Sequence, residues 1–559
     1  MTTLQLSKPS STSVPDSLAH ESGLRWRELA GASLLFTAMA FAVFGWYAFH
    51  GGFVADDWVN ADHYYFHPEP GFWGAVDNYQ TPSRPVAAVW VTLTYAVLGT
   101  DFAAHLVLSV LLAAFLSVAF FAFLRTLGLE LTLALAAAAL LLVFPMSDST
   151  RLWSTGSQIN LFIGLYLVAA TIAIVGRRRF GAAPTVPAVA TQVLASTLAV
   201  TAVAGYEIVA PAVLLSVFLY RWTGGKGGEV WRWLLDAIPT LLVLLLYTRK
   251  FGDSAGGDQL MTNVRLVADG AIWVLSYTFV PVRELSRWNV FWGVAAVVLV
   301  TLLARWAPDR VLRKPNRDTI TRWLGPLLLA IAAIVIGYAM IVPAADRYPI
   351  YAAGVQNRTN CFAALGLCAL VVFVIAALAS MLAAVVPSLS ERHRKWLRDA
   401  LVVIGVLGVI GAYTVRVSEN ADRWVMATDI QAEILDEAHA LVPSPPNDAT
   451  LFTAPYPGNA SPSVPIFGGG GNNDQLGAFK VSYDADEMRS FPLLGETEVI
   501  CGPTSMATPD AGNSETDYGK AILIDFRTDV VYRPKDRSEC VEYTEAMKPY
   551  GPVNLSEEW

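Results

Sequence analysis

The sequence predicts an α-helical polytopic membrane protein with a small α/β or β domain at its C-terminal end. Hydrophobic residues make up 54% of the 559 positions and charged residues only 15%, and the mean hydropathy is +0.45. Apolar runs of about 17 to 25 residues, the length that spans a bilayer as a helix, recur along the chain. From residue 416 onward such runs are absent and the composition changes abruptly.

About eleven membrane spans follow from these runs and from the Lys and Arg residues between them. They are predicted at residues 28–49, 103–124, 129–145, 157–175, 185–204, 208–221, 234–249, 289–305, 323–343, 360–386 and 399–415. Basic residues then fall on one side, which the positive-inside rule assigns to the cytoplasm: Arg25, Arg27, Arg125, Arg177 to Arg179, Arg221, Lys226, Arg232, the run from Arg305 to Arg322, Arg392, Arg394 and Lys395.

Two further apolar stretches are predicted to lie flat on the outer surface rather than span the membrane. The first runs from Pro85 to Thr100, and the second from about Val264 to Val282. Counting the first as a span would turn the triple arginine at residues 177–179 outward, against the charge rule. The alternative is that both stretches are ordinary spans. It leaves the later loops on the predicted side of the membrane but places the loop at residues 177–179 on the outer side.

Three domains follow from this topology. Residues 1–27 are predicted to form a disordered cytoplasmic tail, because the segment is rich in Ser, Thr and Pro and has no periodicity. Residues 28–415 form the transmembrane domain, whose first outer loop covers residues 50–102. Residues 416–559 form an extracytoplasmic domain. The protein is therefore expected in a plasma (inner) membrane, with its N-terminus cytoplasmic.

The C-terminal segment contains Pro and Gly clusters and short β-like runs such as residues 521–526. Its two cysteines, Cys501 and Cys540, lie in an oxidising compartment and are a candidate disulfide, with two free thiols as the alternative. Cys361 and Cys368 share one face of an apolar helix, which is best explained by packing.

The remaining ionisable residues collect on the predicted outer side. Charges near the hydrocarbon boundary are costly unless they pair or line an aqueous cavity, so this one-sided collection indicates a site that handles an ionic group. The residues are Asp56, Asp57, Asp62, His63, Asp77 and Arg84 in the first outer loop, then Asp148, Arg151, Glu207, Arg249, Lys250, Arg347 and Arg358.

An ordered set of short motifs covers about the first 215 residues. It comprises Asp56-Asp57-Trp58 directly after the first span, Arg84-Pro85, Gly99 to His105, Phe144-Pro145, Arg151-Leu152-Trp153 with Gln158 and Asn160, and Glu207 to Pro211. In this order, the set resembles the GT-C superfamily of membrane glycosyltransferases, in particular the protein O-mannosyltransferase-like branch that uses polyprenyl-phosphate sugars. The resemblance implies a GT-C-like transmembrane catalytic domain.

Two departures leave the donor sugar open. Members of the superfamily with a mannosyl donor commonly have Asp-Glu where this chain has Asp56-Asp57. The mycobacterial arabinosyltransferases have Gly-Tyr after the acidic pair, where this chain has Trp58-Val59. The second half of the chain matches the superfamily more loosely.

The chemistry that the resemblance implies needs one carboxylate base. A sugar on a polyprenyl phosphate already has a good leaving group, so a single base that takes the proton of the acceptor hydroxyl is enough for an inverting displacement. Asp56 or Asp57 is the predicted base, and its neighbour orients the acceptor or holds a divalent cation. Superfamily members differ in their need for metal, so Mg²⁺ or Mn²⁺ at this pair stays an alternative.

The leaving phosphate needs fixed positive charge, which an arginine fork supplies well. The candidates are Arg347, Arg358, Arg249 and Lys250, with anchoring of helix ends among lipid headgroups as the alternative. Candidate acceptor- and sugar-binding residues are Trp58, His63, Tyr64, Arg84, Arg151, Trp153 and Glu207. Aromatic residues also form interfacial belts, the histidine is also explained as a satisfied polar residue, and Glu207 also suits a helix N-terminus.

The expected partners are a polyprenyl-phosphate-linked sugar donor, a glycan, lipid or protein acceptor, and membrane lipids, with no nucleic acid. A transporter or lipid flippase is the alternative from another class, but the sequence lacks a clear internal repeat and paired Gly/Pro-broken helices. A polymerase or ligase of cell-envelope polysaccharide is a third interpretation, and such a protein does not need an acidic pair after its first helix.

Overall fold

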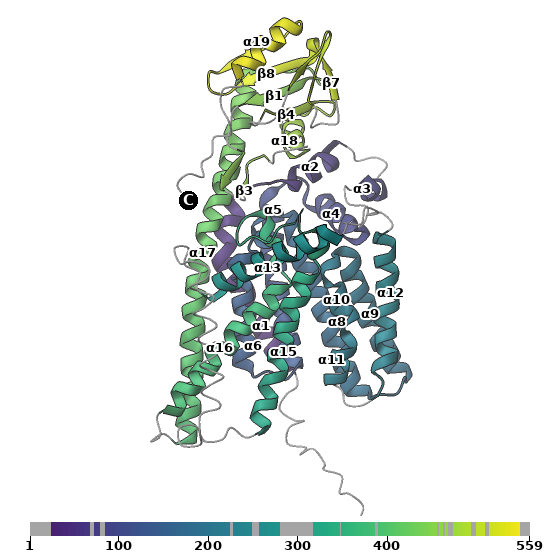
Figure 1. The fold of residues 1–559 in the computed structure, drawn as a ribbon, viewed down its shortest axis with the longest axis vertical. Coiled ribbons are helices and arrows are strands. Elements are labelled where there is room, and N and C mark those ends of the chain that lie inside the picture. The colour runs from purple at the N-terminus through teal and green to yellow at the C-terminus, as the bar shows by residue number, and fades with distance from the viewer. Residues whose placement is uncertain are drawn as a thin grey trace, which may run out of the picture.

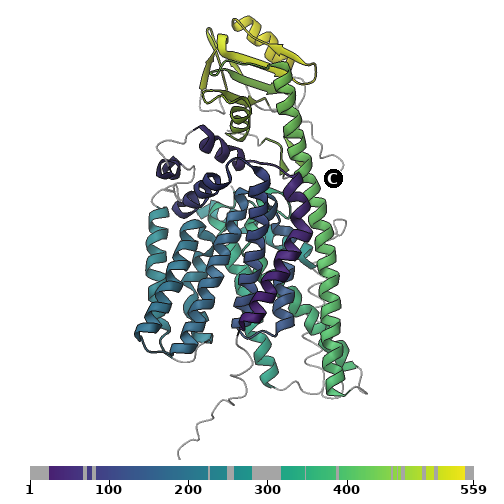
Figure 2. The same cartoon turned by 180° about the vertical axis from the view of Figure 1, so that it is seen from behind.

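The fold is a bundle of apolar helices with a small mixed domain at one end, seen in a computed structural model (Figures 1 and 2). The structure describes residues 24–66, 72–78, 84–223, 227–248, 257–279, 317–346, 348–385, 390–454, 458–461, 464–467, 473–493, 499–508 and 514–547. The predicted span at 289–305, most of the N-terminal tail and the glycine-rich segment at 468–472 lie outside these residues.

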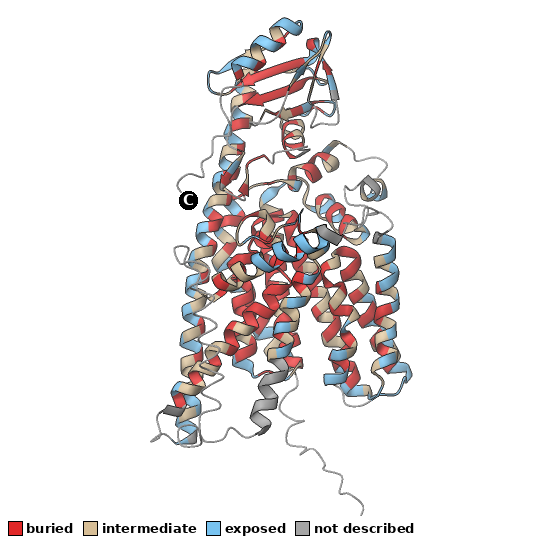
Figure 3. Cartoon of the chain, viewed as in Figure 1, coloured by how far each residue is buried: buried red, intermediate tan, exposed pale blue. Residues whose placement is uncertain are grey.

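Seven of the described helices contain a segment long and apolar enough to cross a membrane. They are α1 (Trp26–His50), α5 (Phe102–Thr126), α8 (Gln158–Phe180), α9 (Val186–Gly205), α15 (Arg317–Ala339), α16 (Ala363–Val385) and α17 (Glu391–Leu441). Their inward faces are buried and many outward-facing residues are exposed, as the colours of Figure 3 show. The polytopic helical class predicted from the sequence is confirmed.

Three other predicted spans have a different local form. The span at 129–145 contains only the 12-residue α6 (Leu131–Leu142), and that at 234–249 coincides up to residue 248 with α12 (Glu229–Thr248), which carries Pro239 in its interior. The span at 208–221 is broken into η4 (Glu207–Val209), α10 (Ala210–Leu214) and α11 (Ser216–Thr223). Pro211 lies in the first turn of α10, where its missing N–H suits the start of a new helix.

The two stretches predicted to lie flat are helices outside this set of seven. The first is α4 (Pro85–Leu98), which is too short to span a bilayer alone. The second is α13 (Gly257–Phe279), which Figure 1 shows crossing the bundle. Both lie near the end of the bundle that carries α2 (Asp56–Phe66) and α3 (Phe72–Asn78).

Basic residues lie at the other end of the bundle. Helix α5 begins beside α4 and, at 1.5 Å per residue, its 25 residues carry the chain about 37 Å to Arg125. The arginines at residues 177–179 end α8, and Arg392, Arg394 and Lys395 begin α17. The short segments around α2 and the basic loops are therefore separated by the length of the bundle.

Helix α17 differs most from the prediction. It runs unbroken through 51 residues, so the domain boundary predicted between residues 415 and 416 falls inside a helix. The apolar run ends near Arg416, but the following residues still favour helix, and Trp424 and Ala427 remain buried against the bundle. The last part of α17 stands clear of the bundle and carries the C-terminal domain (Figure 1).

The C-terminal domain is α/β, one of the two forms predicted. Its main sheet has the order β4-β1-β8-β9, in which β1 pairs parallel with β4 and β8, and β8 pairs antiparallel with β9. The bounds are β1 Thr450–Ala454, β4 Arg489–Pro492, β8 Ala521–Asp525 and β9 Val530–Tyr532. Helix α18 (Asn473–Tyr483) connects β1 to β4 and lies between the sheet and α2 (Figures 1 and 2).

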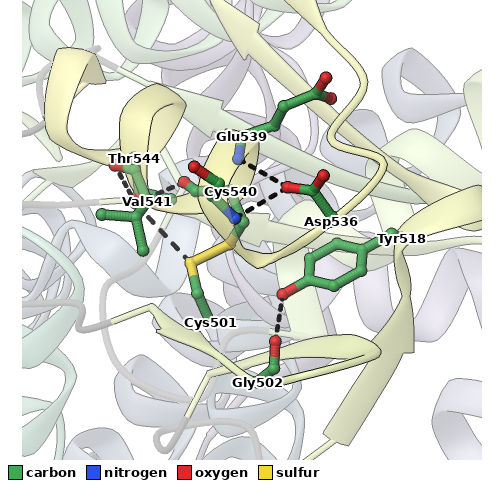
Figure 4. Close-up of a disulfide and its surroundings, with 9 residues drawn as sticks. Cys501, Gly502, Tyr518, Asp536, Glu539, Cys540, Val541 and Thr544 are labelled. Carbon is green, nitrogen blue, oxygen red and sulfur yellow. Dashed lines mark hydrogen bonds between the residues drawn. A yellow bond between two sulfur atoms is a disulfide. The ribbon is translucent and has the colours of Figure 1, made fainter.

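Smaller antiparallel elements complete this domain. They are the pair β2 (Asn459–Ser461) and β3 (Val464–Pro465), and the three-stranded sheet of β5 (Ile500–Cys501), β6 (Ser505–Thr508) and β7 (Ser514–Asp517). Cys501 on β5 and Cys540 on the terminal helix α19 (Arg537–Met547) form a disulfide (Figure 4). This bond ties the small sheet to α19, while Cys361 and Cys368 are buried free thiols.

Close packing between α15 and α16 requires a glycine, and this yields a test of the bundle. A Cβ at Gly366 would overlap the carbonyl oxygen of Ala330, whereas a Cβ at Gly408 on α17 meets nothing within 4 Å. We expect Gly366→Ala to destabilise the protein by about 1–3 kcal/mol and Gly408→Ala to leave it unchanged or slightly more stable. Thermal unfolding of both variants in detergent measures this, and equal midpoints would contradict the packing.

Candidate functional site

The acidic pair lies at a tight corner between α1 and α2. Helix α1 ends at His50, and five residues lead to the start of α2 at Asp56. Ala55, the residue before the pair, has φ of +52°, a left-handed conformation that costs a residue with a Cβ of order 1–3 kcal/mol. The surrounding contacts must offset this cost, and they fix the direction in which each carboxylate points.

Asp57 is fully buried and fully engaged. One carboxylate oxygen accepts hydrogen bonds from the backbone N–H of Thr155 (2.7 Å) and from its hydroxyl (2.6 Å), and the other accepts from the N–H of Val54 (3.2 Å). Its carbonyl accepts from the Tyr95 hydroxyl at 2.8 Å. Burial raises the pKa of Asp57 to about 7, although the Thr155 and Val54 bonds oppose the shift. Asp57 therefore fixes α2 against the segment that leads into α8.

Asp56 has the opposite environment. Its side chain is exposed and makes no hydrogen bond or ion pair within the described part of the chain. The protein still surrounds it closely enough that lost solvation raises the pKa of its carboxyl, while the positive charges of Arg358 and Arg84 lower it. Of the two acids, Asp56 is the one that a ligand can reach.

Arg358 is held by aromatic rings. It lies on η6 (Val355–Asn360), with its guanidinium carbon 4.8 Å from the centre of the Trp153 ring and 5.7 Å from that of Tyr348. Such cation–π contacts fix the plane of the group but use none of its N–H donors. Among the described residues, no carboxylate or carbonyl accepts from this guanidinium.

Arg84 and Glu207 pair with each other. The Arg84 Nε and Nη2 atoms donate to the two Glu207 carboxylate oxygens at 2.9 and 2.6 Å, and the guanidinium also stacks on the Tyr206 ring at 4.6 Å. The sequence predicted both residues as separate ligand contacts. The pair joins the start of α4 to the turn before α10, and it holds a guanidinium near Asp56.

Arg151 was predicted to contact acceptor or sugar, and the structure corrects this. Its side chain is only 1% exposed, and its two terminal nitrogens donate to the carbonyls of Leu141 (2.5 Å) and Ser147 (2.8 Å). These carbonyls lie at and just after the C-terminal end of α6, where a positive charge is favourable. Arg151 therefore caps a helix and is not available to a ligand.

A second buried carboxylate lies beneath the site. Asp148 accepts hydrogen bonds from the side-chain amides of Asn357 and Asn420, both at 2.6 Å. Asn357 precedes Arg358 on η6, and Asn420 lies on α17. Burial raises the pKa of Asp148 to about 6, and the two amides and the charges of Arg151 and Arg416 oppose the shift.

The predicted contacts on α2 divide between two neighbours. The Trp58 indole N–H donates to Gln431 of α17 at 3.2 Å. Tyr64 packs against Tyr95 of α4, and His63 is half-buried on the same helix. Trp58 and Tyr64 hold α2 in place between α17 and α4, and the Trp153 ring is the predicted aromatic that lies at Arg358.

The C-terminal domain rests directly on α2. A Cβ at Gly477 of α18 would overlap the carbonyl oxygen of Trp58, and Lys480 pairs with Asp62 at 3.7 Å. The acidic pair thus lies between the bundle and this domain. Three predicted phosphate contacts, Arg249, Lys250 and Arg347, lie outside the described residues.

An apolar cavity of about 250 Å³ lies inside the bundle, with a lining that runs from Phe362 to Leu124 and Leu129 beside Arg125. This volume is far above the roughly 10–15 Å³ that one water needs. Its wall is formed by α5, α8, α10, α11, α15 and α16, and includes Phe120, Tyr166, Phe218, Ile336, Phe362 and Phe373. Phe362 lies four residues after Arg358, which makes it the lining residue that follows the arginine most closely along the chain.

The acidic pair is the place where the sequence leaves a divalent cation as an alternative. Across the described ranges, no three His, Cys, Asp or Glu side chains group closely enough to hold one. Both oxygens of Asp57 already accept protein hydrogen bonds, which leaves Asp56 as the single carboxylate that could ligate at this point.

Sequence reasoning missed several residues that build the site. Thr155 binds Asp57, Tyr348 and Tyr206 flank the two guanidinium groups, and Asn420 joins Asp148 to α17. Tyr206 had a usable signal, because it precedes an acid in a turn. Thr155 and Asn420 are neutral residues whose partners lie far away in the sequence, and Tyr348 is an aromatic residue ten positions before Arg358.

Comparison with known proteins gives a distant structural similarity. No protein-family model matches the chain, and no curated protein matches it. Among solved structures, the chain is similar to the crystal structure of ArnT from Cupriavidus metallidurans bound to undecaprenyl phosphate. The two are 12% identical, the match covers 82% of this chain and 90% of that one, and the TM-score is 0.39. This similarity carries no argument about the activity of the chain.

The Thr155 hydroxyl offers a test of how the acidic pair is fixed. Thr155→Val removes one donor from a buried carboxylate, and an unmet buried acceptor costs about 1–3 kcal/mol, so we expect a lower unfolding temperature at pH 7.5. Thr155→Ser keeps the hydroxyl and is the matched control. If valine and serine give the same unfolding temperature, the hydrogen bond from this hydroxyl to Asp57 is absent.

Proposed function

We propose that this protein is a membrane glycosyltransferase. It moves a sugar from a polyprenyl-phosphate donor to an acceptor hydroxyl at the extracytoplasmic face, with Asp56 as the general base. The observation that carries the proposal is an exposed acid that feels the charge of an arginine whose N–H donors are unused, with an apolar cavity whose lining includes Phe362, four residues after that arginine. The basic loops at the opposite end of the bundle support an outward-facing site.

A lipid-linked phosphate fits the positions of Arg358 and the cavity. The aromatic rings hold the guanidinium in one plane, so its paired N–H groups can meet two oxygens of a phosphate. The lining of the cavity is almost entirely hydrocarbon, which suits an isoprenoid chain and not a sugar. A phosphate at Arg358 and a lipid tail past Phe362 together describe one amphipathic donor.

Polar atoms near Arg358 suit a sugar. The indole N–H of Trp153 and the side-chain carbonyl of Gln356 are buried and have no hydrogen-bond partner in the parts of the chain that the structure covers. Buried polar atoms of this kind are rare and call for a partner, either water or a ligand. Sugar hydroxyls both donate and accept, and so suit both atoms.

The reaction that these groups support is a single displacement. The oxygen of the acceptor hydroxyl forms a bond to the anomeric carbon while the bond from that carbon to the phosphate oxygen breaks. The hydroxyl proton passes to Asp56, and polyprenyl phosphate leaves with the bonding electron pair, its added charge stabilised by Arg358. One base acting opposite the leaving group gives inversion at the anomeric carbon.

Roles for the other residues follow from their contacts. Asp57 holds α2 through Thr155 and does not take the proton, because both its oxygens are occupied. Arg84, paired with Glu207, adds positive charge near Asp56. No step needs a metal ion.

The test is transfer from radiolabelled polyprenyl-phosphate mannose, glucose and arabinofuranose by the purified protein. We expect Asp56→Asn to lower kcat by about 10²–10⁴-fold, the usual contribution of a general base, with donor binding retained. Asp429→Asn, at an exposed acid on α17 away from the pair, is the matched control and should be fully active. A wild type that neither binds nor turns over any of these donors would reject the proposal and favour a transporter or a polysaccharide polymerase.

The pH dependence of transfer distinguishes the effect of the positive charge of Arg358 on Asp56 from the effect of its planar guanidinium on donor binding. The base must be deprotonated, so kcat should fall as pH drops through the pKa of Asp56. Arg358 lowers this pKa, so Arg358→Gln should shift the acid limb to higher pH. Arg358→Lys keeps the charge and should leave the limb in place while raising the donor KM, because lysine lacks the planar fork. An unshifted limb in Arg358→Gln would exclude Asp56 as the titrating base.

A further inference from the structure

One buried carboxylate connects the segments that carry both walls of the phosphate site. Asp148 follows η2 (Pro145–Ser147) and precedes α7 (Ser149–Leu152), which leads directly to Trp153. Its first oxygen accepts from Asn357, the residue before Arg358, at 2.6 Å. The same carboxylate therefore fixes both the loop that carries Arg358 and the segment that carries the Trp153 ring.

Asn357 reinforces this connection. Its side-chain carbonyl accepts from the N–H of Ser149 at 3.1 Å, and its amide also lies 3.3 Å from the carbonyl of Pro145. Asn360 makes a parallel set of bonds, donating to the carbonyls of Met146 and Tyr351 at 2.7 Å each. The two loops are thus fixed to each other by side-chain amides, without any regular secondary structure between them.

The second oxygen of Asp148 accepts from Asn420 of α17, also at 2.6 Å. Eleven residues further along, Gln431 of the same helix accepts from the Trp58 indole and donates to the carbonyl of Ile466. Helix α17 therefore holds the Arg358 loop at one level and the acid-bearing α2 at another. The distance between these two points along one rigid helix fixes the separation of the two loops.

We propose that Asp148 is a positioning residue that sets Arg358 at the correct place to bind the donor phosphate. The inference rests on the proposed function and deepens it. Asp148 does not touch the substrate: it acts by holding Asn357 and Asn420, and through them it fixes Arg358 relative to Asp56. The charged and titratable groups around it are Arg151, Arg416 and Tyr47.

A charge-pattern swap tests this proposal. Asn420→Asp places a second carboxylate against Asp148 and should disrupt the hydrogen bonds that join Asp148 to Asn357 and to α17. Adding Asp148→Asn restores one carboxylate and one amide, because the new amide can accept from Asn357 and donate to the carboxylate now carried by α17. We expect Asn420→Asp to raise the donor KM about tenfold or more, with a smaller effect on kcat, and the double variant to return within about threefold of wild type.

The same change in an Arg358→Gln background distinguishes positioning from general stability. If Asp148 acts through Arg358, Asn420→Asp should raise KM less than about twofold further when the arginine is already gone. Binding of undecaprenyl phosphate, measured on the same proteins, should follow the same non-additive pattern. Thermal unfolding of each variant checks that the chain is folded.

Two outcomes would overturn the inference while leaving the glycosyltransferase proposal intact. One is an equal loss of donor binding from Asn420→Asp in the wild-type and Arg358→Gln backgrounds, which would make Asp148 a general structural residue. The other is no rescue by the swap. By contrast, a wild-type protein that binds no polyprenyl phosphate and transfers no sugar would reject the glycosyltransferase proposal itself.

Discussion

The position of the exposed acid depends on the hydrogen bonds of its buried neighbour. Asp57 receives two hydrogen bonds from Thr155 and one from Val54, and these bonds fix the first turn of α2 against the start of α8. With Asp57 held inward, the adjacent side chain must point elsewhere, since consecutive helical residues are about 100° apart. Asp56 therefore faces the space that Arg358 and Arg84 also influence. The strained conformation of Ala55 is the cost of this arrangement.

The same division recurs around the site, where most charged side chains are engaged by the protein itself. Arg151 caps α6, Asp148 holds two asparagines, and Arg84 pairs with Glu207. Such pairing is what a low-dielectric surrounding demands of buried charge, and the Arg84 guanidinium in its pair still lowers the pKa of Asp56. Among the described residues of the site, Asp56 and Arg358 keep a carboxylate and a guanidinium that the protein does not use. The proposed chemistry therefore assigns the proton transfer to Asp56 and the phosphate to Arg358.

The sequence predicted the class of fold and the location of the acidic pair, because apolar run length and the sidedness of Lys and Arg are local signals. It could not separate Asp56 from Asp57, since the distinction comes from Thr155, about 100 residues away. It treated Arg84 and Glu207 as independent contacts, although they are partners. It also ended α17 at residue 415, because hydropathy falls there while helical structure continues. Long-range pairing and helix continuity across a change of environment leave no mark in a hydropathy pattern.

An experimental structure of the Asp56→Asn variant with its bound polyprenyl-phosphate sugar would test the central claim most directly. The account predicts the phosphate on Arg358 between Trp153 and Tyr348, the isoprenoid chain in the cavity past Phe362, and the anomeric carbon facing residue 56. A phosphate bound elsewhere in the bundle, with the side chain of residue 56 remote from the sugar, would contradict it.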